Sequence, residues 1–151
     1  MSFFNELYYN QVFWTAILSW FIAQLIKVVL VLITEKRFDF SRFIGSGGMP
    51  SSHSSFVTSL ATMIGLYSGF DSPIFAICFV LALVVMYDAS GVRRAAGKQA
   101  AILNQIVENW DEDIQIQGER LKELLGHTPF EVFAGAALGI AIAIVMHTFV
   151  Y

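Results

Sequence analysis

Charged residues are scarce in this 151-residue sequence: Asp, Glu, Lys and Arg make up 14% of it, whereas hydrophobic residues make up 56%. A soluble domain of this length needs roughly a quarter of its residues charged to keep its surface hydrated. The mean hydropathy is correspondingly high, at +0.64. These values exclude an ordinary soluble domain and indicate that much of the surface faces lipid.

Cysteine is nearly absent, and the N-terminus lacks the features of a cleaved leader. Cys78 is the sole cysteine, so no intramolecular disulfide can form. The cysteine content therefore does not indicate in which cellular compartment the protein lies. Residues 1–10 contain no Lys or Arg, and the apolar run that follows is too long for a signal-peptide core. We therefore expect this run to stay in the mature protein.

Four apolar segments hold most of the hydrophobic residues, and they run over about 12–34, 54–67, 74–87 and 129–150. The first and the last are long enough to cross a ~30 Å hydrocarbon core at about 1.5 Å per residue, whereas the middle two are short for full spans. The last is rich in Ala and Gly, which give helices small surfaces for close packing. The sequence predicts a single all-α domain over residues 1–151, a polytopic membrane helix bundle of about four spans.

One long polar stretch separates the third apolar segment from the fourth. Within it, Ile102, Ile106 and Trp110 recur every four residues and so share one face of a helix. We expect short amphipathic helices over 99–110 and 118–125, in a loop on the cytoplasmic side.

Positive charge is missing from one side of this bundle. Every Lys and Arg except Lys27 lies in residues 35–53 or 88–128, which four spans place on the same side. Loops rich in Lys and Arg stay in the cytoplasm. We therefore expect an integral protein of the cell inner or plasma membrane, with the candidate site facing the cytoplasm and both termini on the outer side.

A run of glycines and serines with one histidine, residues 47–55, leads into the second apolar segment. Gly48 lets backbone approach a ligand closely. Ser51 and Ser52 offer hydroxyls at a helix start, where the helix dipole attracts anions, and His53 can exchange a proton near neutral pH. The run is equally typical of a serine-capped helix with a histidine at the membrane interface.

A second histidine, His127, directly precedes the fourth apolar segment. Glu131 follows it by four residues, so one helical turn can bring carboxylate to imidazole. A carboxylate there would orient the ring and hold its protonated form. Thr128, Pro129 and Glu131 also form the pattern of a capping box. Glu131 is therefore a candidate for a catalytic role, a structural role or both.

Basic residues near the membrane surface form a third feature. Arg93 and Arg94 stand where the third apolar segment ends, with Asp88 before them. The guanidinium fork suits phosphate oxygens, and the alternative is a positive-inside anchor. Lys27 lies about two turns inside the first segment, where a lysine is costly and by default functional, unless its head snorkels to the interface.

These features together favour one chemistry. Two histidines at two helix starts, an arginine pair and a buried lysine can all reach one pocket, a set suited to recognising and transferring a phosphoryl group. No Cys/His ligand spacing is present, and the acidic run 111–113 is more typical of a solvated loop than of a metal site. We expect no metal and no cofactor.

The chain resembles the divergent branch of the type-2 phosphatidic acid phosphatase family, which is related to vanadium-dependent haloperoxidases. The resemblance covers nearly the whole chain. It rests on Gly-Met-Pro-Ser-Ser-His at 48–53, Asp-Ala-Ser-Gly-Val-Arg-Arg at 88–94, and Gly-His-Thr-Pro-Phe-Glu-Val at 126–132 followed by Gly135.

The resemblance implies a metal-independent phosphatase. In the family a histidine that matches His127 attacks phosphorus, and an acidic residue that matches Glu131 orients it. A histidine that matches His53 protonates the leaving oxygen, while donors that match Ser51 and Ser52 hold the phosphate.

The sequence departs from the broader family at several points. Ser52 replaces a glycine, Glu131 replaces an aspartate, and four spans replace six. The family's first motif, Lys and Arg-Pro, is missing because Phe43 follows Arg42, and Lys27 is the stand-in. The Ser-Arg pair that the family places shortly before the last histidine is also absent, so the arginines at 93–94 would supply that charge.

We therefore expect a phosphatase acting on a membrane lipid phosphate, such as phosphatidylglycerol phosphate or a polyprenyl pyrophosphate. The alternative is a non-catalytic membrane protein that binds anionic lipid headgroups or carries a phosphorylated solute. The expected partners are the lipid substrate and the bilayer, with no nucleic acid. The small residues of the last segment are compatible with a homodimer.

Overall fold

The computed structural model describes residues 2–35, 48–108, 121 and 126–151, and this part of the chain contains helices and no strand. The helices are α1 (Phe3–Tyr8), α2 (Gln11–Glu35), α4 (Ser52–Ser68), α5 (Pro73–Ser90), α6 (Val92–Glu108) and α7 (Pro129–Phe149). The all-α prediction is confirmed for these residues.

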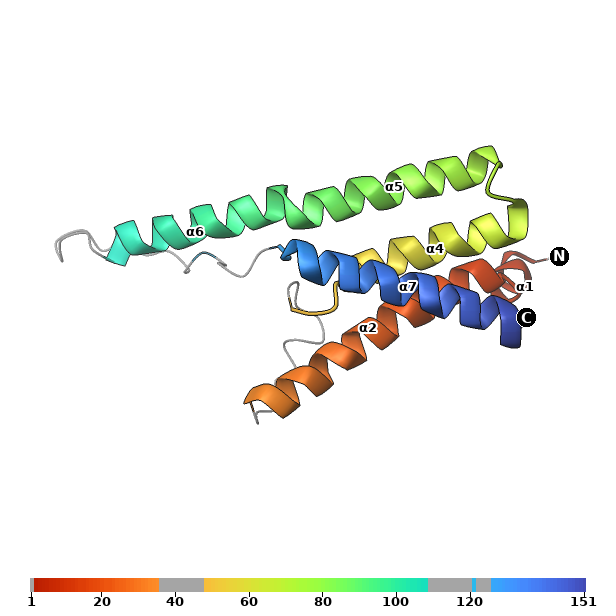
Figure 1. Ribbon diagram of the computed structural model, residues 1–151, viewed down its shortest axis with the longest axis horizontal. Helices are drawn as coiled ribbons and strands as arrows, with labels where there is room; N and C mark the ends of the chain where they lie inside the picture. Colours follow the sequence, from red (N-terminus) through yellow and green to blue (C-terminus); the bar gives the residue numbers. More distant parts are fainter. Residues whose placement is uncertain (1, 36–47, 109–120, 122–125) are drawn as a thin grey trace.

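The long helices form a bundle of alternating direction. Helices α2, α4, α5 and α7 run back and forth along one axis, and both termini lie at the same end (Figure 1). Helix α4 is central and packs against α2, α5 and α7. Helix α6 continues the line of α5 past the start of α7 (Figure 1). The starts of α4 and α7 and the end of α5 therefore lie at the end of the bundle opposite the termini.

Among the described residues, three helices are long and apolar enough to cross a membrane by length and composition: Gln11–Thr34, the combined helix Pro73–Val107, and Pro129–Phe149. The membrane character of the chain is thereby confirmed. Helix α4 has 17 residues, which span about 26 Å at 1.5 Å per residue. It is short for a ~30 Å hydrocarbon core, so the fourth span stays a prediction.

The polar stretch after α5 is helical earlier than the sequence suggested. The prediction that its first helix begins at residue 99 is wrong, because α6 begins at Val92. The Gly91 carbonyl, at the end of α5, accepts a hydrogen bond from the Ala95 N–H at 2.9 Å and so starts the next helix directly. Good helix formers such as Arg and Ala follow, and they keep this polar segment helical. The predicted helix at 118–125 lies outside the described residues, apart from Leu121.

The interior of the bundle is built from small and polar side chains. Its buried apolar residues are mainly alanines, and Thr15, Ser19, Ser55 and Ser59 are also buried, whereas most large hydrophobic side chains are exposed. The hydroxyls of Ser19 and Ser55 lie 2.6 Å apart and join α2 to α4. This inverted distribution is typical of helices that pack closely in lipid, where large apolar groups gain nothing from burial.

Two glycines bring α7 against α4. A Cβ on Gly135 would collide with the carbonyl oxygen of Ser51, and one on Gly139 with the carbonyl oxygen of Ser55. The Ser51 N–H also donates to the Glu131 carbonyl oxygen at 3.0 Å. The starts of α4 and α7 are therefore held together. Because these two glycines pack against α4 of the same chain, they give no support to the expected homodimer, which stays a prediction.

Candidate active site

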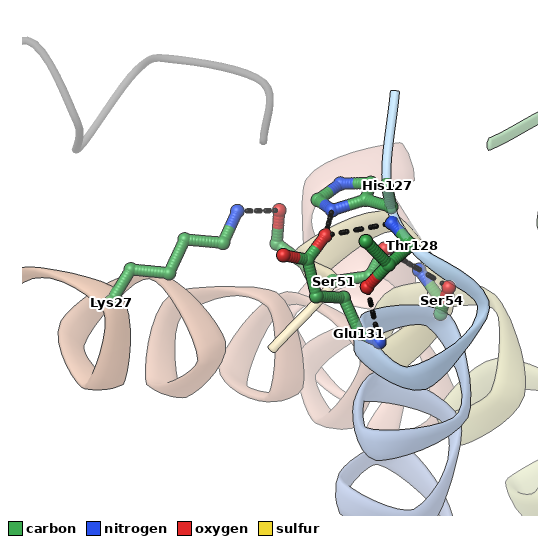
Figure 2. A network of polar contacts seen from close by, with 7 residues as sticks. Lys27, Ser51, Ser54, His127, Thr128 and Glu131 are labelled. Atoms are coloured by element: carbon green, nitrogen blue, oxygen red, sulfur yellow. Dashed lines mark hydrogen bonds and ion pairs between the residues drawn. The ribbon is translucent and has the colours of Figure 1, made fainter. Parts of the chain in front are cut away.

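The start of α7 is organised around the carboxylate of Glu131. Thr128 caps the helix: its hydroxyl accepts from the Glu131 N–H at 3.3 Å, and Glu131 Oε2 accepts from the Thr128 N–H at 2.9 Å. These two bonds form the predicted capping box. The same Oε2 lies 3.1 Å from His127 Nδ1 (Figure 2). One carboxylate therefore makes both of the contacts that the sequence left as alternatives.

The imidazole of His127 is buried and fixed in orientation. His127 is 3% exposed. The ionised carboxylate of Glu131 can only accept hydrogen bonds, so the imidazole proton is on Nδ1. The other nitrogen, Nε2, is buried and has no hydrogen-bond partner among the described residues. Such a nitrogen is costly to leave unsatisfied. It is the ring atom left for a ligand.

The backbone before α7 docks on the junction of α5 and α6. The His127 N–H donates to the Ala89 carbonyl oxygen at 2.9 Å. Gly126 has a φ of +90°, and a Cβ there would collide with the backbone of Arg93 and Arg94. Only glycine fits such a position without strain. This contact of Gly126 could not be predicted from the sequence, because a glycine before a helix indicates a turn and not which segment it touches.

A small cavity lies against His127 where three helices meet. Its lining residues are His53, Val85, Ala89, Arg93, Gly126 and His127. The volume open to the centre of a water molecule is about 10 Å³, which is room for one water. His53 and Arg93 are the exposed members of this lining. Their side chains would have to move outward to admit a phosphoryl group.

The two neighbouring arginines have different surroundings. Arg93 lines the cavity and donates from Nε to Asp88 Oδ2 at 2.6 Å, with both side chains partly exposed. A guanidinium has five N–H donors, so this bond leaves most of them for another acceptor. Asp88 supports the site by holding Arg93 in place. Arg94 is exposed and lies outside the described lining of the cavity.

Lys27 reaches the site from α2. It is 3% exposed, and its Nζ donates to Ser52 Oγ at 3.2 Å. In Figure 2 its side chain extends toward the start of α4, on the side where Glu131 and His127 lie. The ammonium group is therefore buried between α2 and the start of α4.

The remaining predicted residues lie at the start of α4. Ser51 caps the helix, and its hydroxyl accepts from the N–H of Ser54 at 3.3 Å and lies 3.0 Å from the Ser54 hydroxyl. Ser52 is buried and faces Lys27, as described above. Gly48 has a φ of +81°, so backbone shape accounts for the glycine there. The serine cap and the polar site thus coexist in this segment.

Burial favours the neutral form of the His127 imidazole. Burial lowers the pKa of His127 below its ordinary value of 6.5, the hydrogen bond to Glu131 opposes this shift, and the positive charge of Lys27 adds to it. At neutral pH the imidazole is therefore uncharged, with Nε2 unprotonated. This is the form in which a histidine acts as a nucleophile.

Some predicted features lie outside the described residues, namely Arg42, Phe43 and the acidic run at 111–113. Within the part of the chain that the structure describes, no three His, Cys, Asp or Glu side chains gather in a way that could hold a metal ion.

Comparison with known proteins identifies the family. The chain matches the divergent PAP2 family over residues 8–142. It is 41% identical over 138 residues to YuiD of Bacillus subtilis (strain 168), described as an uncharacterized membrane protein, and the match covers 84% of this chain and 87% of that protein. No solved structure matches. All three motifs that meet at the cavity lie inside the matched region, and the chain therefore belongs to the divergent PAP2 family.

Proposed function

We propose that this protein is a metal-independent phosphatase that hydrolyses a membrane lipid phosphate through a phosphohistidine intermediate. One observation carries the proposal: the buried imidazole of His127 has Nδ1 engaged by Glu131, while Nε2 has no partner among the described residues. A neutral, oriented imidazole with one open nitrogen is suited to nucleophilic attack. Membership of the divergent PAP2 family supports phosphatase chemistry.

In the first step the Nε2 lone pair of His127 attacks phosphorus. An N–P bond forms as the bond from phosphorus to the leaving oxygen breaks, and His53, which has to be protonated for this step, gives its proton to that oxygen. The carboxylate of Glu131 stabilises the positive charge that develops on the attacking ring. Arg93, which lines the cavity, and Lys27 would stabilise the phosphoryl oxygens as their charge develops.

In the second step water hydrolyses the phosphohistidine. His53, now neutral, takes a proton from the water molecule as its oxygen attacks phosphorus. The N–P bond breaks, its electron pair returns to His127 Nε2, and inorganic phosphate leaves. Both histidines return to their starting protonation states.

The substrate is a lipid phosphate because the site lies at one end of a bundle of apolar helices. Phosphatidylglycerol phosphate and polyprenyl pyrophosphate both present a phosphoryl group at the membrane surface. We place the site on the cytoplasmic side, with α2, α4, α5 and α7 as four spans and the termini outside. In cells that carry Cys78→Ala, a cysteine at Asp71 should react with an impermeant thiol reagent and one at Lys98 should not. The reverse pattern would invert the topology.

The proposal is tested by phosphate release from detergent-solubilised protein. Wild type should release phosphate from at least one of the two lipids, and His127→Ala should not. His147→Ala is the matched control, since His147 lies in the last turn of the same helix, far along α7 from the site, and it should keep full activity. A wild type that binds the lipid and releases no phosphate would instead support a non-catalytic protein that binds or carries phosphorylated ligands.

A further inference from the structure

A groove between α2 and α4 opens beside His53. It is lined by Ile17, Trp20, His53 and Phe56 and has a volume of about 360 Å³, within the usual range for sites that bind small molecules. Apart from His53 its lining is apolar or aromatic. His53 also lines the small cavity at His127. It therefore stands between a polar cavity and an apolar groove.

The chemistry of phosphoryl transfer restricts where the rest of the substrate can lie. The attacking atom and the leaving oxygen are roughly in line, on opposite sides of phosphorus. With His127 as the nucleophile and His53 as the acid, the leaving oxygen lies next to His53. Whatever is bonded to that oxygen continues away from His127, and the groove between α2 and α4 begins there.

We infer that this groove binds the hydrocarbon chain of the leaving group. The inference rests on the proposed function and adds the surface that recognises the lipid. Ile17 and Trp20 from α2 form one wall, and Phe56, one turn after His53 on α4, forms the other. A chain held there fixes the leaving oxygen at the imidazole of His53, so binding energy from the chain is used to align the reaction.

A second groove offers a built-in comparison. It lies between α4, α5 and α7, has a volume of about 510 Å³, and is lined by apolar side chains such as Phe79, Leu83 and Phe133. By size alone it would be the better lipid site. Among the described residues it shares no lining residue with the cavity at His127. We therefore assign the hydrocarbon chain of the substrate to the α2–α4 groove, because that groove is lined by His53, although the other groove has the larger volume.

Two alkyl phosphates with the same leaving chemistry test this inference, namely hexadecyl phosphate and butyl phosphate. Ile17→Trp fills the α2–α4 groove, and the matched control Leu83→Trp fills the larger one. We expect Ile17→Trp to lower kcat/KM for hexadecyl phosphate by roughly tenfold or more, the effect of a methylene-scale misfit in an apolar pocket. Its activity on butyl phosphate should be unchanged, and Leu83→Trp should change neither substrate.

Phe56→Ala gives an independent measurement should the tryptophan variant not assemble. It removes one wall of the groove and should also cost activity on hexadecyl phosphate alone. A selective loss in Leu83→Trp, or equal losses on both substrates in Phe56→Ala, would overturn the assignment of the chain while leaving the phosphatase intact. A wild type inactive on both alkyl phosphates and on lipid phosphates would overturn the proposed function and this inference with it.

Discussion

The two histidines of the site stand at the starts of neighbouring helices, yet their surroundings differ. His127 is 3% exposed and bonded to Glu131, whereas His53 is exposed and no hydrogen bond to its ring is found among the described residues. His53 follows a serine and His127 follows a glycine, so the local pattern does not distinguish them. The helices packed around each one do.

This difference is the basis of the roles that we propose for the two rings. A nucleophile must be neutral, oriented and protected from water, which describes His127. A general acid must exchange protons with solvent between the two steps, which suits the exposed ring of His53. When two titratable groups share a site, their environments separate the acid from the base or nucleophile. Variants of the two histidines and of their neighbours test this contrast.

The largest expected effect separates the two rings directly. His127→Ala should reduce turnover by a factor on the order of 10⁶, as loss of a nucleophile does elsewhere. His53→Ala should cost only about 10²–10⁴-fold, the usual contribution of a general acid. Steady-state phosphate release measures both.

The leaving group provides the control for that contrast. A substrate whose leaving oxygen needs no protonation, such as an aryl phosphate, should restore the first step in His53→Ala, seen as a rapid burst of released aryl alcohol, and should give no burst in His127→Ala. Equal losses in the two variants on every substrate would remove the distinction between the histidines.

Glu131→Gln should come next, because it removes the charge that orients His127. The capping box should survive, since glutamine caps a helix nearly as well as glutamate. Activity should fall by up to ~10⁴-fold, the loss found when the carboxylate partner of a catalytic histidine becomes an amide. Thermal unfolding in detergent should be unchanged, whereas full activity in a stable variant would leave Glu131 with the cap alone.

The same variant has a signature in pH. Burial keeps the pKa of His127 below 6.5, and the bond to Glu131 raises it against that trend. The active form is neutral, so kcat/KM should fall as the pH drops through a value below 6.5. Without the carboxylate the pKa falls further, and this acid limb should move to lower pH. A shift to higher pH would contradict the assignment of the limb to His127.

Lys27→Met should have the third-largest effect. It removes one charged hydrogen-bond donor, which corresponds to roughly 10- to 100-fold weaker phosphate binding. Folding should not suffer, because a buried charge inside a span is costly. The positive charge of Lys27 lowers the pKa of His127, so the acid limb should move to higher pH. Unchanged kinetics would show that Lys27 has no part in the site.

The smallest effect compares the adjacent arginines. Arg93→Lys keeps the charge at the cavity but loses the planar fork, for a loss of roughly tenfold in kcat/KM. Arg94→Lys is the matched control and should change little, because Arg94 lies outside the described cavity lining. Equal effects of the two variants would show that Arg94 also reaches the phosphate.

Local features of the fold were predictable from the sequence. The start of α7 is determined by neighbouring residues in the sequence, namely Thr128, Pro129 and Glu131. The structure has the predicted capping box there. Apolar runs likewise located α2, α4, α5 and α7 to within a few residues, because helix formation in lipid depends on hydropathy. Lys27, His53 and His127 were singled out from their chemistry, and the structure has all three near the starts of α4 and α7.

Relations between helices were not predictable. Nothing in the spacing shows that Gly126 meets the backbone of Arg93, or that Gly135 meets the carbonyl of Ser51. These contacts depend on how one helix is shifted and rotated against another. The same limit explains why Arg93 and Arg94 looked equivalent in sequence. The helix after Gly91 was expected too late for a different reason: the basic residues and the glycine within 92–98 indicated a loop, whereas the backbone continues there as α6.

Trapping the covalent intermediate tests the central claim most directly. His53→Ala, incubated with a ³²P-labelled aryl phosphate and quenched in alkali, should carry an acid-labile, alkali-stable label on the peptide that contains His127. The double variant His53→Ala with His127→Ala should carry none. A phosphohistidine found on His53 in His127→Ala would reverse the roles of the two rings, and a wild type that hydrolyses substrate with no label in any variant would contradict the phosphohistidine mechanism.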